Sequence, residues 1–204
     1  MSDRLWAGVD VGAAKGFDVA ALDAGGLAAG PERLRTPEKV VAWLRALRPR
    51  LTAVDSPRCP APDGARSRAD ERALAAAVCG IRYTPDAGAL AASPRYYAWV
   101  AHGLALYAVL DRAGLAACEC FPTATWTRLG GPRDGRPRGT WSDAVLRGQP
   151  DVAGLPPRLG QDARDAIGAA LTARLHDAGA TERYGEIVVP RSAASSARPR
   201  GESR

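Results

Sequence analysis

The chain has 204 residues, which is enough for one α/β domain with a buried core and too few for a second full domain. Apolar residues make up 46% and charged residues 25%, and no apolar run approaches the roughly 18 residues of a membrane-spanning helix, so a membrane protein is not expected. The net charge of +6, carried almost wholly by arginine, weakly favours a nucleic-acid partner over a charge balance that only keeps the protein in solution. The first residues lead into a strand-like segment without a secretory signal, so we expect a cytoplasmic protein.

The first predicted elements are three antiparallel strands. Residues 5–11 form a short apolar run, typical of a central strand that is buried on both faces, and two glycines supply the turn that follows. Residues 17–22 alternate partly between apolar and polar side chains, and the turn-forming residues 23–26 lead into a hairpin partner at 27–29. The chain is therefore expected to open with an antiparallel meander.

A helix and a fourth strand are predicted next. Thr36 is the expected N-cap and Pro37 the first helical residue, and apolar residues continue at helical spacing until the next proline. Residues 51–55 lack alternation, which predicts a strand buried beside the first one. Both neighbouring strands carry an aspartate near the carboxyl end, Asp10 and Asp55.

The rest of the chain predicts further helices and strands around a loop-rich insertion. Expected are helices at 68–78, 94–112 and 161–178, a strand at 115–121, a flexible insertion rich in Gly, Pro and Arg near 130–160 with at most a short helix near Trp141, and a closing edge strand at 187–189. The composition of residues 191–204 predicts a disordered basic tail. The expected fold class is α/β: one domain at 1–190 with a mixed five-stranded sheet, three antiparallel strands followed by parallel ones, flanked by helices.

Acidic residues occur where a buried sheet should carry none. A crossover helix would make the first and fourth strands neighbours, so Asp10 and Asp55 would lie side by side at the carboxyl ends, where open α/β sheets bind ligands. Asp162 and Asp165 are one helical turn apart and share a helix face. Each acid alone also fits a turn, a cap or a solvent-facing position, so the prediction rests on their joint placement, together with Glu119 on the fifth strand.

Such a cluster of carboxylates is unfavourable unless cations neutralise it. Oxygen ligands of this kind select Mg²⁺ or Mn²⁺, and these ions support hydrolysis of phosphodiester bonds. The four cysteines and two histidines have no spacing that resembles a zinc site.

Four motifs, in this order, carry a resemblance to a known family: Gly8-Val9-Asp10-Val11-Gly12, Val54-Asp55-Ser56-Pro57, Glu119-Cys120-Phe121-Pro122 and Asp162-Ala163-Arg164-Asp165-Ala166. Over roughly residues 5 to 190 the chain resembles the predicted-nuclease family called domain of unknown function 429, which is assigned to the ribonuclease H-like fold and is related in architecture to RuvC-type Holliday-junction resolvases.

The resemblance implies a metal-dependent nuclease whose metal ligands are Asp10, Asp55, Asp162 and Asp165, with Glu119 as a further catalytic acid. Family members often carry paired acids at the start of the helical motif, whereas Gln161 precedes Asp162 here. Either helical aspartate can therefore be the primary ligand.

Basic residues near the first two acids are candidates for binding phosphates of a nucleic acid. They are Lys15, Arg58, Arg66, Arg68 and Arg72. The same arginines equally fit a solvated face paired with neighbouring acids. Tyr96, Tyr97 and Trp99 fit base stacking, although aromatic residues at this spacing are more often part of a core.

Two other functions and one assembly question stay open at this point. The segment Asp10-Val11-Gly12-Ala13-Ala14-Lys15 also resembles the first phosphate loop of actin-like ATPases and sugar kinases, which usually need a second comparable domain. The chain also fits a nucleic-acid-binding scaffold that keeps the fold without turnover. A homodimer, as in junction resolvases, is compatible with the sequence.

Overall fold

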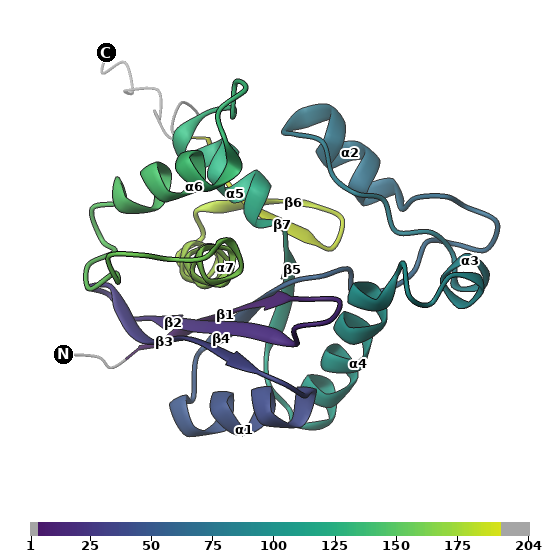
Figure 1. Cartoon of the computed structure of the whole chain (residues 1–204), viewed down its shortest axis with the longest axis horizontal. Coiled ribbons are helices and arrows are strands. Elements are labelled where there is room, and N and C mark those ends of the chain that lie inside the picture. The colour runs from purple at the N-terminus through teal and green to yellow at the C-terminus, as the bar shows by residue number, and fades with distance from the viewer. Residues whose placement is uncertain (1–3, 193–204) are drawn as a thin grey trace, which may run out of the picture.

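A single mixed sheet of seven strands organises the chain (Figure 1). The computed structural model describes residues 4–192, and the strands lie in the order β3-β2-β1-β4-β5-β7-β6. β1, β2 and β3 form an antiparallel meander, β4, β5 and β7 continue the sheet in parallel with β1, and β6 pairs antiparallel with β7. The strand bounds are Trp6–Val11 for β1, Phe17–Leu22 for β2, Leu27–Leu34 for β3, Leu51–Asp55 for β4, Ala117–Cys120 for β5, Thr181–Tyr184 for β6 and Ile187–Pro190 for β7.

Helices cover both faces of this sheet. In Figure 1, α1 and α4 lie on one side of the sheet, while α7, α5 and α6 lie on the other, and α2 and α3 belong to the long connection between β4 and α4. No helix in the described part of the chain combines the length and the apolar character needed to cross a bilayer. The helix bounds are Pro37–Leu47 for α1, Ala69–Ala77 for α2, Ala87–Ala92 for α3, Ala98–Arg112 for α4, Pro122–Gly130 for α5, Arg138–Arg147 for α6 and Gln161–Asp177 for α7.

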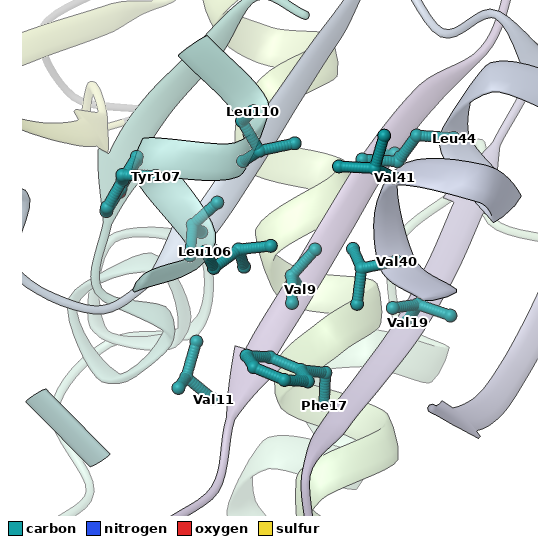
Figure 2. Packing of buried hydrophobic residues seen from close by; sticks show 12 residues of the cluster. Val9, Val11, Phe17, Val19, Val40, Val41, Leu44, Leu106, Tyr107 and Leu110 are labelled. Carbon is teal, nitrogen blue, oxygen red and sulfur yellow. The ribbon is translucent and has the colours of Figure 1, made fainter. Parts of the chain in front are cut away.

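Alternation along β1 and β2 divides their side chains between the two faces. Odd-numbered residues of both strands pack against apolar side chains of α1 and α4, and they form a cluster that includes Val9, Val11, Phe17, Val19, Val40, Val41, Leu44, Leu106, Tyr107 and Leu110 (Figure 2). Because successive side chains of a strand point to opposite faces, Gly8 and Asp10 face the other side, where α7 crosses the sheet. The first strand thus contributes core on one face and an acid on the other.

The mixed sheet with antiparallel and then parallel strands is confirmed, but it has seven strands instead of five. The predicted edge strand at 187–189 is internal, because β6 pairs with its outer side and forms the true edge. β6 is only four residues long, and all four, Thr181, Glu182, Arg183 and Tyr184, are polar or amphipathic, so it lacks the apolar pattern of a strand. Of the predicted tail at 191–204, all but the first two residues lie outside the described residues.

The segment between α2 and the fifth strand differs from the expected single helix at 94–112. α4 begins only at Ala98, and a separate short helix, α3, precedes it, with the Asp86 carboxylate accepting a hydrogen bond from the backbone N–H of Ala89. The expected N-cap, Ser93, instead closes α3, since its backbone N–H donates to the carbonyl of Leu90. Residues 93–97 therefore form a turn that leaves Tyr96 exposed.

The region near 130–160, predicted to be a flexible insertion, packs into the core instead. It contains α6, where Trp141 and Leu146 are buried, and Val152 beyond the helix is buried in the same apolar cluster as Ile167 of α7. The many glycines, prolines and arginines mark tight turns around α6. Because these residues dominate the composition of the segment, the sequence does not reveal the few large apolar residues that anchor it to the domain.

Candidate active site

A cavity of about 520 Å³ lies at the carboxyl ends of β1 and β4. All five predicted acids line it, and so do Lys15 and Arg68 of the predicted phosphate-binding residues. Trp99, one of the aromatic residues considered for base stacking, lines it too, as do residues that the sequence did not single out, among them Glu71, Arg82 and Arg138. The cavity therefore brings together side chains from β1, β4, β5, α2, α4, α6, α7 and the loops that connect them.

Asp10 and Asp55 are neighbours because β1 and β4 run parallel in register. The two residues are paired across the strands, one step after the pair Val9 and Val54. Since Val9 and Val54 both belong to the core under α1 and α4, the next residue on each strand faces α7. The crossover topology that the sequence predicts thus places both carboxylates on the same face, at the same end of the sheet.

Close packing of α7 on β1 brings the helical acids to this place. Gly8 is opposite the α7 backbone, where a Cβ atom would overlap Ala166 and Ala170. Ala169 and Ala173 are also fully buried against the sheet. Because only small residues occupy this contact, the helix axis can approach the strand closely, and the first turn of α7 reaches the end of β1.

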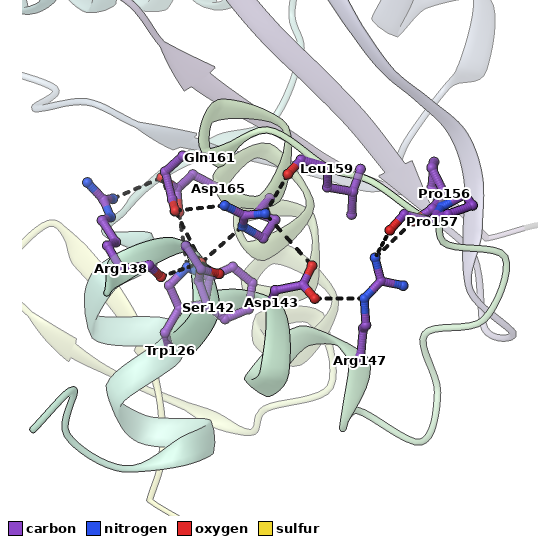
Figure 3. Close-up of polar contacts among 12 residues, drawn as sticks. Trp126, Arg138, Ser142, Asp143, Arg147, Pro156, Pro157, Leu159, Gln161 and Asp165 are labelled. Atoms are coloured by element: carbon purple, nitrogen blue, oxygen red, sulfur yellow. Dashed lines mark hydrogen bonds and ion pairs between the residues drawn. The ribbon is translucent and has the colours of Figure 1, made fainter. Parts of the chain in front are cut away.

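Asp165 is buried, and three side chains hold its carboxylate. The Trp126 Nε1–H donates to it at 3.0 Å, the Gln161 Nε2 amide at 2.9 and 3.0 Å, and the Arg138 guanidinium at 2.9 Å. Figure 3 shows these donors around Asp165, and they come from α5, α6 and α7. Gln161, at the position where an acid is common in the resembled family, here orients the neighbouring aspartate.

Asp162 is more open and contacts two cations. Lys15 Nζ lies 3.1 Å and Arg33 Nη2 lies 3.0 Å from the same carboxylate oxygen of Asp162. Arg33 also pairs with Asp18, which is across from Asp10 on β2. Asp18 is an acid of the site that the sequence analysis missed. The period of two along β2, with Phe17 and Val19 facing the α1 side, is the signal that could have placed it on the α7 face.

Burial and mutual repulsion shape the protonation of the central acids. Burial raises the pKa of Asp10, and the negative charge of Asp55 raises it further, followed by the charges of Asp165, Asp162 and Asp18. Burial likewise raises the pKa of Asp55, to which the Asp165 charge adds. The pKa of Asp165 is raised by burial, against the opposing effect of Arg138. These carboxyl groups therefore favour protonation or a bound cation over free negative charge.

Glu119 lines the cavity but belongs to the opposite face of the sheet. Its register partner on β4 is Val54, not Asp55, so it faces the same side as Val54. There the Arg68 guanidinium binds both of its carboxylate oxygens, and the backbone N–H of Arg58 donates to it at 2.9 Å. Burial raises the pKa of Glu119 and the Arg68 pairing opposes that rise. Glu119 is paired with Arg68 on the opposite face of the sheet, and this separates it from the cluster of Asp10, Asp55, Asp162 and Asp165.

Most of the predicted phosphate-binding arginines have other contacts. Arg68 is buried and pairs with Glu71 as well as Glu119. Arg58 pairs with Asp111, and Arg72 donates to the carbonyl and hydroxyl oxygens of Ser67. Arg58, Arg66 and Arg72 are not among the residues that line the cavity. Lys15, with a side chain 64% exposed beside Asp162, is the predicted cation best placed for a phosphate.

The residues present fit a divalent cation. Oxygen atoms of Asp10, Asp18 and Asp162 lie within 4.8 Å of one another, and Mg²⁺ prefers such oxygen donors. With all groups ionised, the cavity wall carries six carboxylates against four cationic side chains, and this surplus equals the charge of one divalent ion. The cationic side chains of the wall are Lys15, Arg68, Arg82 and Arg138.

Comparison with known proteins identifies the fold. No family model matches the chain, and no curated protein matches it. Among solved structures the chain is similar to RuvC of Thermus thermophilus, with 17% identity and a TM-score of 0.51 over 86% of this chain and 96% of that chain. It is also similar to T. thermophilus RuvC in complex with a Holliday junction substrate, with 15% identity, a TM-score of 0.53 and the same coverage. The chain therefore has the ribonuclease H-like fold of RuvC, as the mixed sheet and its flanking helices also indicate.

Proposed function

We propose that this protein is a divalent-metal-dependent nuclease that hydrolyses phosphodiester bonds of DNA or RNA. The observation that carries the proposal is the meeting of four aspartates from β1, β4 and α7 in one cavity: Asp10, Asp55, Asp162 and Asp165. The proposal includes membership of the family called domain of unknown function 429, whose motifs contain the same four residues. The T. thermophilus RuvC in complex with a Holliday junction substrate supports nucleic acid as the partner class, because that protein shares this fold.

The chain's own residues divide the work of such a site. Asp10, with Asp55, Asp162, Asp165 and the additional Asp18, would hold Mg²⁺ or Mn²⁺, an ion that lowers the pKa of water and neutralises charge that develops on a phosphate. Arg138 and Trp126 fix the orientation of Asp165. Lys15, mostly exposed next to Asp162, can bind a phosphate oxygen when the ion takes over the neutralisation of that acid.

The test is a cleavage assay with purified protein on single-stranded, duplex, hybrid and four-way-junction substrates, with Mg²⁺ or Mn²⁺. Asp10→Asn keeps the shape of the side chain and removes its charge, so we expect it to lower the cleavage rate by more than the ~10–100-fold typical of losing an outer-shell partner. Asp134→Asn is the matched control. Asp134 is exposed in a loop at φ 49°, a conformation that asparagine also tolerates, and this variant should cut like the wild type.

The proposal is wrong if no substrate is cut with either ion, or if Asp10→Asn cuts as fast as the wild type. Tight ATP binding in a calorimeter, without affinity for any of these nucleic acids, would instead favour the phosphate-loop interpretation of residues 10–15. Both experiments use the full chain, so no fragment has to fold on its own.

A further inference from the structure

One part of the cavity wall differs in chemistry from the aspartate cluster. It is formed by the connection after α2, by the first turn of α4 and by the residue after β5, and it contributes Ile81, Arg82, Thr84, Trp99 and Phe121. A site that only held a metal ion and a phosphate would not need aromatic and apolar side chains of this size. This part of the wall therefore suits a ligand group with an apolar face.

One exposed aromatic residue, Tyr96, continues this wall onto the surface. Within residues 4–192, Tyr96 at 61% and Tyr83 at 44% exposure are the large hydrophobic residues that remain exposed. Tyr96 is in the turn before α4 and holds the ring of Tyr97 edge-on, with the ring centroids 4.7 Å apart. An aromatic ring presented to water next to a cavity is typical of surfaces on which an unpaired base stacks.

Arg82 links the exposed tyrosine to the cavity. Its guanidinium lies 4.4 Å from the ring centroid of Tyr96 and 5.7 Å from that of Trp99, and it also lines the cavity. No ion pair is found for it among the residues that the structure describes, unlike Arg33, Arg58 and Arg68. Contact with aromatic faces holds the guanidinium plane in place without neutralising its charge, which leaves it available to a phosphate.

Buried polar atoms without partners support a missing ligand at this wall. In the described part of the chain four side-chain atoms are buried without a hydrogen-bond partner, and two of them, Thr84 Oγ1 and Trp99 Nε1, belong to residues that line the aromatic side of the cavity. A third, the Ser56 hydroxyl, packs against Gly103 of α4. Burying a donor without a partner costs free energy, and a bound group with polar edges would recover it after a small movement.

We propose that Arg82, Tyr96 and Trp99 form a subsite for one unpaired nucleotide, whose base stacks on the Arg82–Tyr96 pair while Arg82 contacts a phosphate of the same strand. This inference rests on the proposed nuclease function, because the strand bound here would lead into the aspartate cluster. It adds a substrate class to that function: a single strand, or an unpaired nucleotide at a junction or end. Stacking tolerates any base, since every base has a π-face, so the subsite selects unpaired structure over sequence.

The test is binding of a fluorescein-labelled oligodeoxythymidylate, followed by fluorescence anisotropy at low salt in EDTA, which prevents metal-dependent cleavage. Tyr96→Ala should weaken binding by ~10-fold or more, as expected for the loss of one stacked base. Tyr96→Phe keeps the ring and should bind within about twofold of the wild type, and Arg82→Ala should weaken binding while Arg82→Lys restores part of it. Tyr83→Ala removes the other exposed tyrosine and is the matched control with unchanged affinity.

Binding of a duplex of the same length is measured in parallel, and it distinguishes base stacking from general electrostatic attraction. We expect Tyr96→Ala to leave duplex binding unchanged. The subsite is refuted if Tyr96→Ala binds the single strand within twofold of the wild type, a result that would point to a protein partner for the tyrosines. It is also refuted if the duplex and the single strand lose affinity equally.

Failure of the proposed function gives a different signature. A wild type that cuts nothing but loses affinity through Tyr96→Ala would overturn the nuclease activity and keep the subsite. If the wild type cuts, and Tyr96→Ala cuts and binds as well as the wild type, the subsite is wrong and the nuclease activity stands.

Discussion

Asp165 is an acid of the cavity whose position depends on its neighbours. Its carboxylate accepts hydrogen bonds from Trp126, Arg138 and Gln161, so it has one orientation before any ligand arrives. Groups held in this way by surrounding donors are typical of preorganised sites. The role of Trp126 here is polar as well as apolar, because its ring also fills the core beside α7.

Trp126→Phe tests this dual role. The phenylalanine ring keeps most of the packing but removes the Nε1–H donor, so one bond to a buried carboxylate is lost. We expect a loss of about 1.5–3 kcal/mol in the free energy of unfolding, measured by urea denaturation. Cleavage activity should fall as well, because Asp165 keeps only Gln161 and Arg138 as donors.

Trp141→Phe is the matched control for that variant. The Nε1–H of Trp141 donates to the carbonyl of Gly131 at 3.2 Å, and its ring is equally buried, but its donor binds a backbone carbonyl and not Asp165. This variant should lose stability and keep its cleavage activity once folded. Equal loss of activity in both variants would contradict a specific role of Trp126 in holding Asp165.

The contact between α7 and β1 is the element on which the site depends. Gly8→Ala would place a methyl group into the backbone of α7 at Ala166 and Ala170, where neither partner is a flexible side chain. We expect a loss of about 3 kcal/mol or more in the free energy of unfolding, measured by chemical denaturation. The cleavage rate should also fall, since α7 can accept the methyl group only by moving Asp162 and Asp165 away from Asp10.

Gly80→Ala provides the comparison, because a Cβ atom there meets nothing within 4 Å and the backbone is not in the left-handed region. Its stability should change by no more than about 0.5 kcal/mol. If Gly8→Ala were as stable and active as Gly80→Ala, the close approach of α7 to β1 would not be required for the site.

Elements with strong periodicity could be predicted from the sequence, and elements defined by tertiary contacts could not. β1, β4 and α7 follow from apolar runs and helical spacing that need no knowledge of the rest of the chain. α5 was missed because Thr123, Thr125 and Thr127 are poor helix formers, and burial of Trp126 outweighs that propensity. The edge strand β6 was missed because it is short and polar.

The same division applies to the site. Asp10, Asp55, Asp162 and Asp165 could be predicted to meet, because strand register and helical spacing are local patterns that the topology combines. The face of the sheet on which the Glu119 side chain lies could not be predicted, since it depends on how β5 pairs with β4. The pairing of Arg68 with Glu119 and the placement of Arg82 on Tyr96 also depend on the path of the long connection between β4 and α4.

On the scale of the whole molecule, the raised pKa values of Asp10, Asp55 and Asp165 link stability to pH. Between the ordinary aspartate pKa of 3.8 and the raised values, the folded protein keeps protons that the unfolded chain has released. The folded state therefore binds more protons, and the free energy of unfolding falls as the pH rises through this range. A cation bound at the cluster removes this dependence by replacing the protons.

Thermal unfolding in EDTA should show this effect between about pH 6 and pH 8. Each kcal/mol lost lowers the Tm by about 2–4 °C in a chain of this size, and we expect a fall of at least that amount. Asp10→Asn should flatten the profile, and Mg²⁺ should raise the wild-type Tm most at the alkaline end. Burial lowers the pKa of His176, which acts in the opposite direction at the acidic end, so the wild type is compared with Asp10→Asn at each pH. A Tm that rises with pH in this difference would contradict the assigned shifts.

The late position of α7 in the chain has a consequence for synthesis on the ribosome. The strands with Asp10 and Asp55 emerge first, while Asp162 and Asp165 follow only after most of the chain has been translated, at roughly 5–20 residues per second. β5 must likewise wait for β7 before its outer side is covered. A nascent polypeptide therefore lacks two of the four aspartates of the cluster, Asp162 and Asp165, until translation is nearly complete.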